Sequence, residues 1–340
     1  MSASSRINRQ VVLKARPQGI PQAEHFELIE TAAPEPAEGQ ILVRNEFLSV
    51  EPAMRGWVNA AANYSEPVPI GGVMRSLAAG QVIASRHPDY RAGDAVCGWF
   101  GWQDYAAVPV SAVDTRITDD RIRLSAWLGV LGLNGLTAYF GLLDVGQPKP
   151  GETVLVSTAA GSVGSCVGQI AKLMGCRAVG IAGGPVKTAQ CTDAFGFDAA
   201  IDYKAGNLEA ALDAACPEGI DVYFDNTSGA ISDAVLSRLR VGARVVICGT
   251  ASIGNWDPFP QGPRVERHLL VKRARMQGFI VLDYQARYPQ ARAALSHWVH
   301  EGWIRHQEDI LEGLESAPDA IAGLYRGENL GKRLIRVHQD

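Results

Sequence analysis

The sequence predicts an α/β protein in two parts, one mostly β and the other a parallel sheet covered by helices. Two observations lead to this prediction. Residues 12–50 alternate in the manner of strands and are punctuated by Pro and Gly clusters such as APEPAEGQ. From about Leu131 strands and helices alternate, which implies a parallel sheet. A chain of 340 residues, 47% of them hydrophobic, is long enough for about two domains.

The β part reads as a small barrel or sandwich. Its clearest strand is GQILVRNEFLSV, and further turn-bounded strands follow at AAGQVIAS and AGDAVCGWFGWQDYAAVP. The chain closes with IRHQEDI, a short helix near 318–325 and a final strand, KRLIRV. Because these last strands could return to the β part, we expect the first domain to be discontinuous.

The second part contains five apolar strands, each followed by a change of pattern. They are TVLVST, CRAVGIAG, DAAIDY, GIDVYFDN and ARVVICGT, separated by helical stretches including 235–239. A further run, MQGFIVLDY, precedes a helix expected over 288–301. Ligands of such sheets bind outside the carboxyl ends of the strands, so these ends are where a site is expected.

Composition excludes several classes of partner. The net charge is −4, from 32 basic and 36 acidic residues, and no block of like charge exceeds VKRAR, so nucleic acid and membrane surfaces are not expected partners. MSASSRINRQ lacks the apolar core of a signal peptide, and no run approaches the roughly 18 apolar residues of a membrane span. Six cysteines show no paired spacing, which indicates free thiols in a reducing compartment. We expect a cytoplasmic protein.

The stretch VLVSTAAGSVGSCVGQIAK has the layout of a dinucleotide-binding loop. It reads as strand, tight turn and helix, and Ala159, Gly161 and Gly164 occupy the places of the three glycines in the Rossmann pattern. Ala159 departs from that pattern. The helix N-terminus could receive a pyrophosphate, and the alternative is a tight turn without a ligand.

The next strand indicates which dinucleotide. An NAD-binding protein would carry Asp or Glu near its end, but GIAGGPVK has neither. Gly183 and Gly184 leave space, Pro185 can start a helix, and Lys187 lies where a 2′-phosphate would. This favours NADPH over NADH, although Lys187 could equally be a solvated helix residue.

Two further strand ends should face the same cleft. Cys248 and Gly249 follow one of them, and Asn226 follows the other. Asn226 could bond to ribose or nicotinamide, or it could cap the helix that starts near Gly229.

A metal site is not expected. A catalytic zinc needs three protein ligands and an open position, and the first 130 residues offer only Cys97, His25 and His87 as soft ligands. His297 and His300 could share a metal from one helix, but a solvent-facing pair has the same spacing.

Eight segments resemble the zinc-independent medium-chain reductases, a family that includes prostaglandin reductase, plant alkenal double-bond reductases and bacterial curcumin reductase. They are AAGSVGSCVGQIAK, GIAGGPVK, DAAIDYK, VYFDNTSG, KRARMQGFIVLDY, GENLGKRLIRV, VEPAMRGWVN and NGLTAYFGLLDVG. The resemblance implies a GroES-like β-barrel domain (1–130 with 306–340) and a Rossmann domain (131–305). It also implies a homodimer and NADPH-dependent reduction of the carbon–carbon double bond of α,β-unsaturated aldehydes or ketones, by hydride transfer to the β-carbon.

The family's cofactor contacts carry over by motif. Tyr203 would join Lys187 at the 2′-phosphate, and Asn329 would reach the nicotinamide side. The full set that the resemblance implies is Gly161, Ser162, Val163, Gly164, Lys187, Tyr203, Asn226, Cys248, Gly249, Thr250, Phe279, Ile280, Val281 and Asn329.

The sequence departs from several relatives at two positions. Ala53 and Gly254 stand where those relatives carry tyrosines, so no proton-donor role can be transferred to them. Tyr64 is the candidate replacement, and the alternative is an ordinary loop aromatic. Arg55 could face the substrate carbonyl or pair with Glu51 or Asp104 inside the protein.

Other readings of the sequence stay open. The four aromatics of GWFGWQDY (Trp99, Phe100, Trp102 and Tyr105) suit either a pocket wall or the barrel core. The same hydride donor could serve a quinone, which would make the chain an NADPH quinone oxidoreductase. The missing tyrosines also suit an NADPH-binding sensor or structural protein without turnover.

Overall fold

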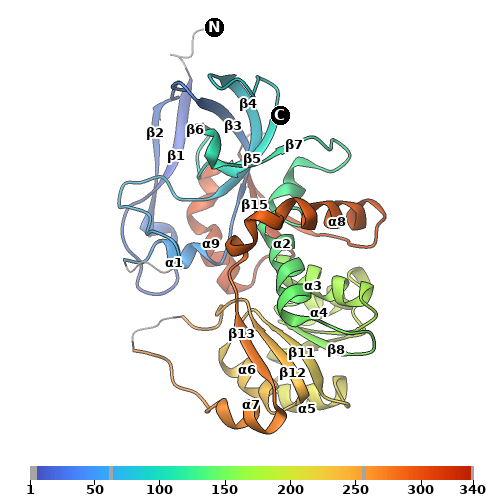
Figure 1. The fold of residues 1–340 in the computed structure, drawn as a ribbon. Helices are drawn as coiled ribbons and strands as arrows, with labels where there is room; N and C mark the ends of the chain where they lie inside the picture. The colour runs from blue at the N-terminus through green and yellow to red at the C-terminus, as the bar shows by residue number, and fades with distance from the viewer. Residues whose placement is uncertain (1–5, 61–63, 255–257, 338–340) are drawn as a thin grey trace. The chain divides into compact units, whose positions relative to one another are not determined.

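The computed structural model describes residues 6–60, 64–254 and 258–337. The chain divides into two compact units (Figure 1). We call Met1–Leu128 with Glu308–Asp340 the barrel-like unit, and Gly129–Gln307 the parallel-sheet unit. The α/β fold class that the sequence predicts is confirmed.

Strand pairing in the barrel-like unit is antiparallel except between its two C-terminal strands, which pair in parallel and join the N-terminal strands. Strands β1 (Ile7–Leu13) and β2 (Phe26–Ala32) form a two-stranded sheet. The larger sheet runs in the order β14 (Glu308–Glu312), β15 (Lys332–Arg336), β3 (Gln40–Ser49), β4 (Leu77–Ser85), β5 (Ala95–Trp99) and β7 (Val113–Ile117), with β6 (Tyr105–Pro109) also paired to β3. The helices are α1 (Met54–Trp57), α9 (Ala317–Arg326) and the 3-10 turns η2 (Ala23–His25), η3 (Val110–Ala112), η4 (Leu124–Leu128) and η9 (Leu314–Ser316).

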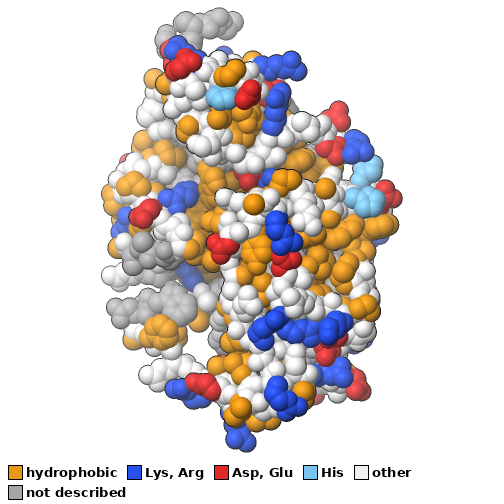
Figure 2. Space-filling view, in the orientation of Figure 1, with side chains coloured by type: hydrophobic (Ala, Val, Ile, Leu, Met, Phe, Trp, Pro, Cys, Tyr) orange, Lys and Arg blue, Asp and Glu red, His pale blue; other side chains and the backbone are white. Residues whose placement is uncertain are grey.

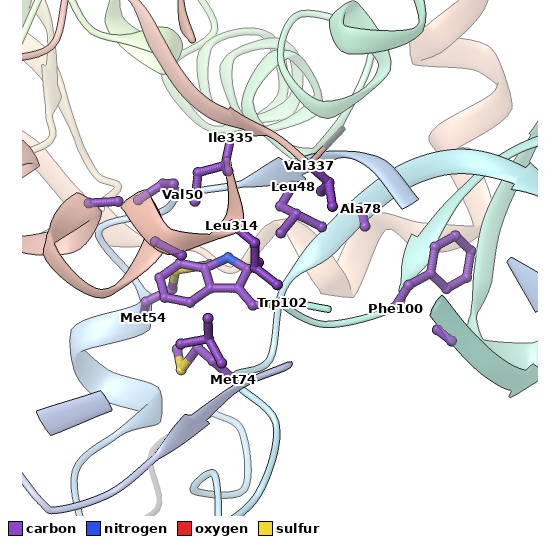
Figure 3. Packing of buried hydrophobic residues seen from close by; sticks show 14 of the residues in the cluster. Leu48, Val50, Met54, Met74, Ala78, Phe100, Trp102, Leu314, Ile335 and Val337 are labelled. Atoms are coloured by element: carbon purple, nitrogen blue, oxygen red, sulfur yellow. The ribbon is translucent and has the colours of Figure 1, made fainter. Parts of the chain in front are cut away.

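The core of this unit forms around Trp102. Its indole is fully buried and lies among Met54, Met74 and Leu314 (Figure 3). The indole N–H donates to the carbonyl oxygen of Ser49 over 3.1 Å, so the buried polar atom is satisfied.

Of the four aromatics in GWFGWQDY, two are core residues. Trp102 and Phe100 are buried, whereas Trp99 and Tyr105 are half-buried. The Trp99 ring meets that of Trp57 edge-on, with the centroids 5.8 Å apart.

The parallel-sheet unit has six strands, and all adjacent pairs are parallel (Figure 1). Their order is β10 (Ala199–Asp202), β9 (Arg177–Ala182), β8 (Thr153–Ser157), β11 (Ile220–Asp225), β12 (Leu239–Ile247) and β13 (Arg275–Gly278). Numbered within this unit, the order is that of the doubly wound Rossmann fold, and it reverses between β8 and β11. The carboxyl ends of these two strands therefore mark the expected ligand position.

Helices connect these strands. The α-helices are α2 (Leu133–Phe140), α3 (Ser162–Leu173), α4 (Pro185–Ala189), α5 (Leu208–Ala215), α6 (Gly229–Leu236), α7 (Glu266–Lys272) and α8 (Tyr288–His300). The π-turns η5 (Gly141–Gly146) and η6 (Gln190–Ala194) extend α2 and α4, and η7 (Tyr203–Ala205) and η8 (Val281–Arg287) are 3-10 turns. α3 is buried all round from Gly164 to Ala171, and Val167, Ile170 and Ala171 are among its buried apolar residues.

Two segment predictions were wrong in their bounds. The helical stretch expected over 235–239 ends at Leu236, because β12 already begins at Leu239. The long run after Gly93 is two strands, β5 and β6, separated by a turn in which Gly101 has a φ of +73°. MQGFIVLDY leaves the sheet after Gly278 and turns into η8.

The surface carries charges of both signs. On the face in Figure 2, Lys and Arg side chains are interspersed with Asp and Glu. Among the residues with a described position, no helix combines the length and the apolar character needed to cross a membrane.

Candidate cofactor site

The glycine loop begins where β8 ends. Gly161 is the N-cap of α3, and its N–H donates to the carbonyl oxygen of Thr158 over 2.9 Å. A Cβ at position 164 would lie 2.3 Å from that same oxygen and 2.9 Å from Cα of Ala159. Only glycine therefore allows α3 to start this close to the strand. The first-turn N–H groups of a helix have no partner within it, so those of α3 form a site suited to an anion.

Ala159 stands where the Rossmann pattern has glycine, and a glycine in the neighbouring strand β9 makes room for its methyl group. Ala159 is fully buried, and its N–H donates to the carbonyl oxygen of Ile181 on the β9 side over 2.9 Å. Gly180 lies opposite, and a Cβ there would come within 2.7 Å of the Ala159 methyl. The glycine missing from the loop is matched by a glycine in β9, so the motif keeps its close packing.

Two side chains of η7 lie over a glycine in the loop after β9. A Cβ at Gly183 would lie 2.9 Å from Cε1 of Tyr203 and 3.0 Å from Cε of Lys204. Gly184 has a φ of +91°, and α4 begins at Pro185, as predicted. Lys187 is half-buried on this helix, and Tyr203 is 42% exposed.

Asn226 ties together the ends of the two strands at the reversal point. Its main-chain N–H donates to Ser157 Oγ over 2.8 Å, and its Nδ2 donates to the Ser157 carbonyl oxygen over 2.7 Å. The alternative of a helix cap was wrong: Ser228 is the N-cap of α6, and no side-chain bond caps that helix.

Asp225, which the sequence analysis missed, organises the same loop. Its buried carboxylate accepts from the Tyr223 hydroxyl over 3.0 Å, from Ser232 Oγ over 2.6 Å, and from the N–H groups of Thr227 (2.9 Å) and Ser228 (2.8 Å). Burial and the Asp225 charge raise the pKa of Tyr223, so its hydroxyl keeps the proton that it donates. The available signal was the polar run DNTSG directly after a buried strand, but sequence alone does not show which of its side chains point into the protein.

The loop that Asp225 holds is strained. Ser228 has φ +58° and ψ −163°, a region populated almost only by glycine. Its N–H bond to Asp225 and an Oγ bond to the Gly249 carbonyl oxygen over 3.3 Å hold this conformation. The strain therefore lies at the carboxyl edge of the sheet, beside Asn226.

The segment after β12 is anchored to the same aspartate. The N–H groups of Cys248 and Gly249 donate to the main-chain oxygen of Asp225 over 2.8 and 3.1 Å. A Cβ at Gly249 would lie 3.0 Å from the Asn226 carbonyl oxygen. Burial, assisted by Asp225, raises the pKa of the Cys248 thiol to about 12, so the sulfur is neutral near pH 7.

The segment after β13 uses its side chain for packing. The Phe279 ring is edge-on to Phe224 and Tyr284, at centroid distances of 6.4 and 6.3 Å, and a Cβ at Gly141 would lie 2.5 Å from its Cζ. The Val281 carbonyl oxygen accepts from the Tyr288 hydroxyl over 3.1 Å.

Comparison with known proteins identifies the family. Residues 9–115 match a family described as the N-terminal domain of oxidoreductase, and residues 162–297 match the zinc-binding dehydrogenase family. The chain is 44% identical over 352 positions to an NADPH-dependent curcumin reductase of Escherichia coli (strain K12), covering 100% of both proteins. It is 37% identical over 339 positions to a 2-alkenal reductase (NADP(+)-dependent) of Nicotiana tabacum, covering 98% of both. The crystal structure of CurA from Vibrio vulnificus in complex with NADPH is similar, with a TM-score of 0.92 and 44% identity over 98% of this chain and 100% of that one.

The chain belongs to the NADPH-dependent double-bond reductases of the medium-chain dehydrogenase/reductase family. The family resemblance and the choice of NADPH, both predicted from the sequence, are confirmed. The residues of the parallel-sheet unit fit the cofactor: a Cβ would fill the space at Gly164, and no acidic residue ends β9.

The reductase has two further candidate residues in its barrel-like unit. Asn329 is half-buried just before β15, and its Nδ2 donates to the Gly331 carbonyl oxygen over 2.8 Å. Tyr64 is 50% exposed, at the start of a described segment.

Tyr64 belongs to a small polar cluster. The Arg55 guanidinium carbon lies 4.9 Å from the Tyr325 ring centroid, and the Tyr325 hydroxyl donates to the Pro52 carbonyl oxygen over 2.9 Å. Burial raises the pKa of Tyr325, the Arg55 charge lowers it and Tyr64 raises it again, which indicates that the three side chains are neighbours. Sequence reasoning missed Tyr325 because it comes from α9, more than 250 residues away along the chain.

The two acids weighed as partners of Arg55 each form an ion pair within the barrel-like unit. Asp104 forms an ion pair with Arg9 over 3.0 Å, and Glu51 forms one with Lys332 over 2.7 Å. The buried Lys332 Nζ also donates to Ser49 Oγ and to the Val50 carbonyl oxygen, and burial lowers its pKa.

Two of the residues weighed as metal ligands contact a carbonyl oxygen and an aromatic ring. The Cys97 thiol is buried and donates to the Trp127 carbonyl oxygen over 3.6 Å, and the His297 ring is edge-on to Trp303, with centroids 5.2 Å apart. Within residues 6–60, 64–254 and 258–337, no group of three or more His, Cys, Asp or Glu side chains could hold a metal.

Proposed function

We propose that this reductase saturates the carbon–carbon double bond of α,β-unsaturated aldehydes and ketones with NADPH. The observation that carries the proposal is the full-length similarity to a curcumin reductase and a 2-alkenal reductase, together with a glycine loop that keeps its packing. Bound NADPH supplies the hydride that adds to the β-carbon.

The cofactor would lie along the carboxyl edge of the parallel sheet. The first turn of α3, from Gly161 to Gly164, would bind the pyrophosphate. Lys187 and Tyr203 would bind the 2′-phosphate. Asn226, the segments Cys248–Thr250 and Phe279–Val281, and Asn329 would contact the ribose and nicotinamide.

The protein has two further tasks in the reaction. A hydrogen-bond donor at the carbonyl oxygen stabilises the negative charge that develops there, and a proton must reach the α-carbon. We assign the proton to Tyr64, the candidate that the sequence offers, whose side chain is 50% exposed and so accessible to a substrate. The Arg55 guanidinium lies over the Tyr325 ring in this cluster, 4.9 Å from its centroid.

Product analysis tests the reaction. The purified protein is incubated with NADPH and a medium-chain 2-alkenal, the product is identified by mass, and NADH is run in parallel. We expect the saturated aldehyde, with NADPH preferred. Hydroquinone formation from a quinone without enal reduction would replace the proposal with a quinone reductase, and tight NADPH binding without turnover would replace it with a sensor.

Lys187→Ala tests the cofactor assignment. A hydrogen bond to a charged group contributes roughly 1.5–3 kcal/mol, so we expect NADPH to bind about 10- to 100-fold more weakly and NADH to be hardly affected. Equal losses for both cofactors, measured by fluorescence titration, would remove Lys187 from this role.

Tyr64→Phe tests the proton donor. General acid catalysis contributes about 10²- to 10⁴-fold, so we expect kcat to fall steeply while the affinity for NADPH is unchanged. Turnover equal to the wild type at every pH would end the assignment, and Tyr325→Phe serves as the comparison within the same cluster.

We also propose a homodimer, as the family resemblance implies. β13 is an edge strand of its sheet, and Leu270 and Val271 on the preceding α7 are 78% and 52% exposed, which suits burial against a second copy. A monomeric mass in sedimentation analysis would contradict it.

A further inference from the structure

An acidic residue at the end of β10 lies beside the loop after β9, and a phosphate site there must offset its charge. Asp202, the last residue of β10, pairs with Ala182 in the neighbouring β9. Its Oδ1 accepts the N–H of Gly184 over 2.8 Å and that of Lys204 over 2.9 Å. These two main-chain bonds hold the pKa of Asp202 below its usual value, so the carboxylate is charged near pH 7. A negative charge thus lies directly beside the loop that leads into α4.

With Lys187 as the only cation, the negative charge of a phosphate bound at this loop would not be balanced. A phosphate monoester carries about 1.5 to 2 negative charges at pH 7. Lys187 supplies a single positive charge, and the carboxylate of Asp202 adds a negative charge beside the same loop. A second cation would strengthen the preference for NADPH that the relatives' names and the loop sequence indicate.

Lys204 is placed to be that cation. Its Cε would lie 3.0 Å from a Cβ at Gly183, and its Nζ is 6.0 Å from the centroid of the Tyr203 ring. Tyr203 itself packs over Gly183, so both side chains converge on the glycine pair that precedes Lys187. The Lys204 side chain is exposed, which leaves it accessible to a ligand from solvent.

We propose that Lys204 is a second determinant of NADPH specificity, pairing with the 2′-phosphate beside Lys187 and offsetting the carboxylate of Asp202. The inference rests on the proposed cofactor position and adds to it a residue that the motif comparison did not include. Because Asp202 holds the loop through main-chain N–H groups, the Lys204 side chain can be removed without breaking that support.

Lys204→Met is the direct test, since methionine keeps much of the aliphatic stem and removes the charge. Partly exposed ion pairs are modest, so we expect NADPH to bind about 3- to 10-fold more weakly and NADH to change less than about 2-fold. The affinity for 2′,5′-ADP should fall in parallel, while that for 5′-AMP should not. Lys204→Arg should restore most of the NADPH affinity, because arginine keeps the charge.

A matched control removes the same charge elsewhere in this unit. Lys149 is exposed and precedes β8, at the amino end of the sheet. Lys149→Met should leave the affinities for all four ligands within about 2-fold, since charges beyond about 8 to 10 Å are largely screened at physiological salt. A loss in this variant equal to that of Lys204→Met would reduce the effect to net charge and overturn the inference.

Two further outcomes would overturn it. An unchanged NADPH affinity in Lys204→Met would show that the ammonium group does not reach the phosphate. Equal losses for NADPH and NADH would show that Lys204 acts on the loop. If the wild type still reduces the enal with NADPH preferred, either outcome removes only Lys204, whereas a wild type without that activity removes the proposed function.

Discussion

The glycine loop of the parallel-sheet unit and the Glu51–Lys332 pair of the barrel-like unit are stabilised in different ways. At the carboxyl edge of the parallel-sheet unit, the candidate cofactor site is defined by missing side chains and by main-chain N–H groups, as at Gly161 and Gly164. In the barrel-like unit, buried charges hold the structure, and Lys332 pairs with Glu51 at 2.7 Å. The comparison teaches that substitutions fail for different reasons in these two regions: added volume at the glycine loop and an unpaired charge around Lys332.

The largest effect is expected from Lys332→Met. Removing one partner of a buried ion pair leaves the other charge uncompensated and costs about 3–5 kcal/mol, and here Ser49 and Val50 also lose a donor. We expect a correspondingly lower urea midpoint. Adding Glu51→Gln should recover part of the loss, because the remaining charge is removed.

Lys14→Met is the control for that variant, since Lys14 is exposed in the same unit. Exposed substitutions usually change the free energy of unfolding by less than about 0.5 kcal/mol. Equal urea midpoints for Lys332→Met and Lys14→Met would contradict the idea that buried charge holds the barrel-like unit.

Gly164→Ala should be next in size. The added methyl would lie 2.3 Å from the Thr158 carbonyl oxygen, so α3 must move away from β8. Overpacking of this kind costs about 1–3 kcal/mol, and the displaced helix N-terminus should weaken NADPH binding at least about ten-fold, by loss of charge-assisted hydrogen bonds. Isothermal titration and urea unfolding measure the two effects.

Gly278→Ala is the matched control, because a Cβ there meets nothing within 4 Å. We expect its stability and NADPH affinity to stay close to those of the wild type. Unaltered NADPH binding in Gly164→Ala would break the comparison, since volume would then not limit the cofactor edge.

A smaller effect, of opposite sign, is expected at Ser228. Glycine accepts φ +58° with ψ −163° without strain, so Ser228→Gly should be more stable than Ser228→Ala by about 0.5–1 kcal/mol, even though glycine makes the unfolded chain more flexible. Both variants lose the bond to Gly249, so their difference isolates the backbone. Equal free energies of unfolding would show that Ser228 is not strained.

The smallest expected effect is the chemical reactivity of the cysteines in the folded protein. Burial raises the pKa of Cys166, Cys191 and Cys248 to about 12, and all three lie in the parallel-sheet unit. A thiol without thiolate is a poor nucleophile, so the folded protein should take up almost no N-ethylmaleimide or enal at pH 7.5, as read by intact mass. In urea, all six free cysteines should react. Rapid uptake by the folded protein would contradict this.

The same cysteines predict how stability changes in alkaline solution. Their pKa is raised on folding, from about 8.5 for a free thiol, so the unfolded chain loses these protons first. The stabilisation is complete below about pH 8.5 and is lost as the pH rises toward 12. Urea midpoints measured across this range should fall, and cysteine-to-serine variants should flatten the fall.

Sequence patterns were sufficient for the fold class and for the glycine loop, because both depend on local periodicity and on residues close together in the chain. The helix starting at Pro185 is such a case. The Glu51 to Lys332 pair and the position of Tyr325 depend on strands and helices that meet only after folding, and no local pattern contains them. The Asp225 network was missed for a related reason: a charged residue at the end of an apolar strand reads as exposed, yet six neighbouring hydroxyl and N–H groups make its burial possible.

The Ala159 methyl group occupies the space beside Gly180 in β9, so the effect of a substitution at one of these positions depends on the residue at the other. Glycine at both positions keeps the packing, whereas alanine at both would place two methyl carbons about 2.7 Å apart. A Cβ at 180 would also lie 3.2 Å from the Phe197 ring. Restoring the missing loop glycine therefore removes one of the two obstacles to a side chain at 180, and the Phe197 ring must still shift by a few tenths of an ångström to admit it.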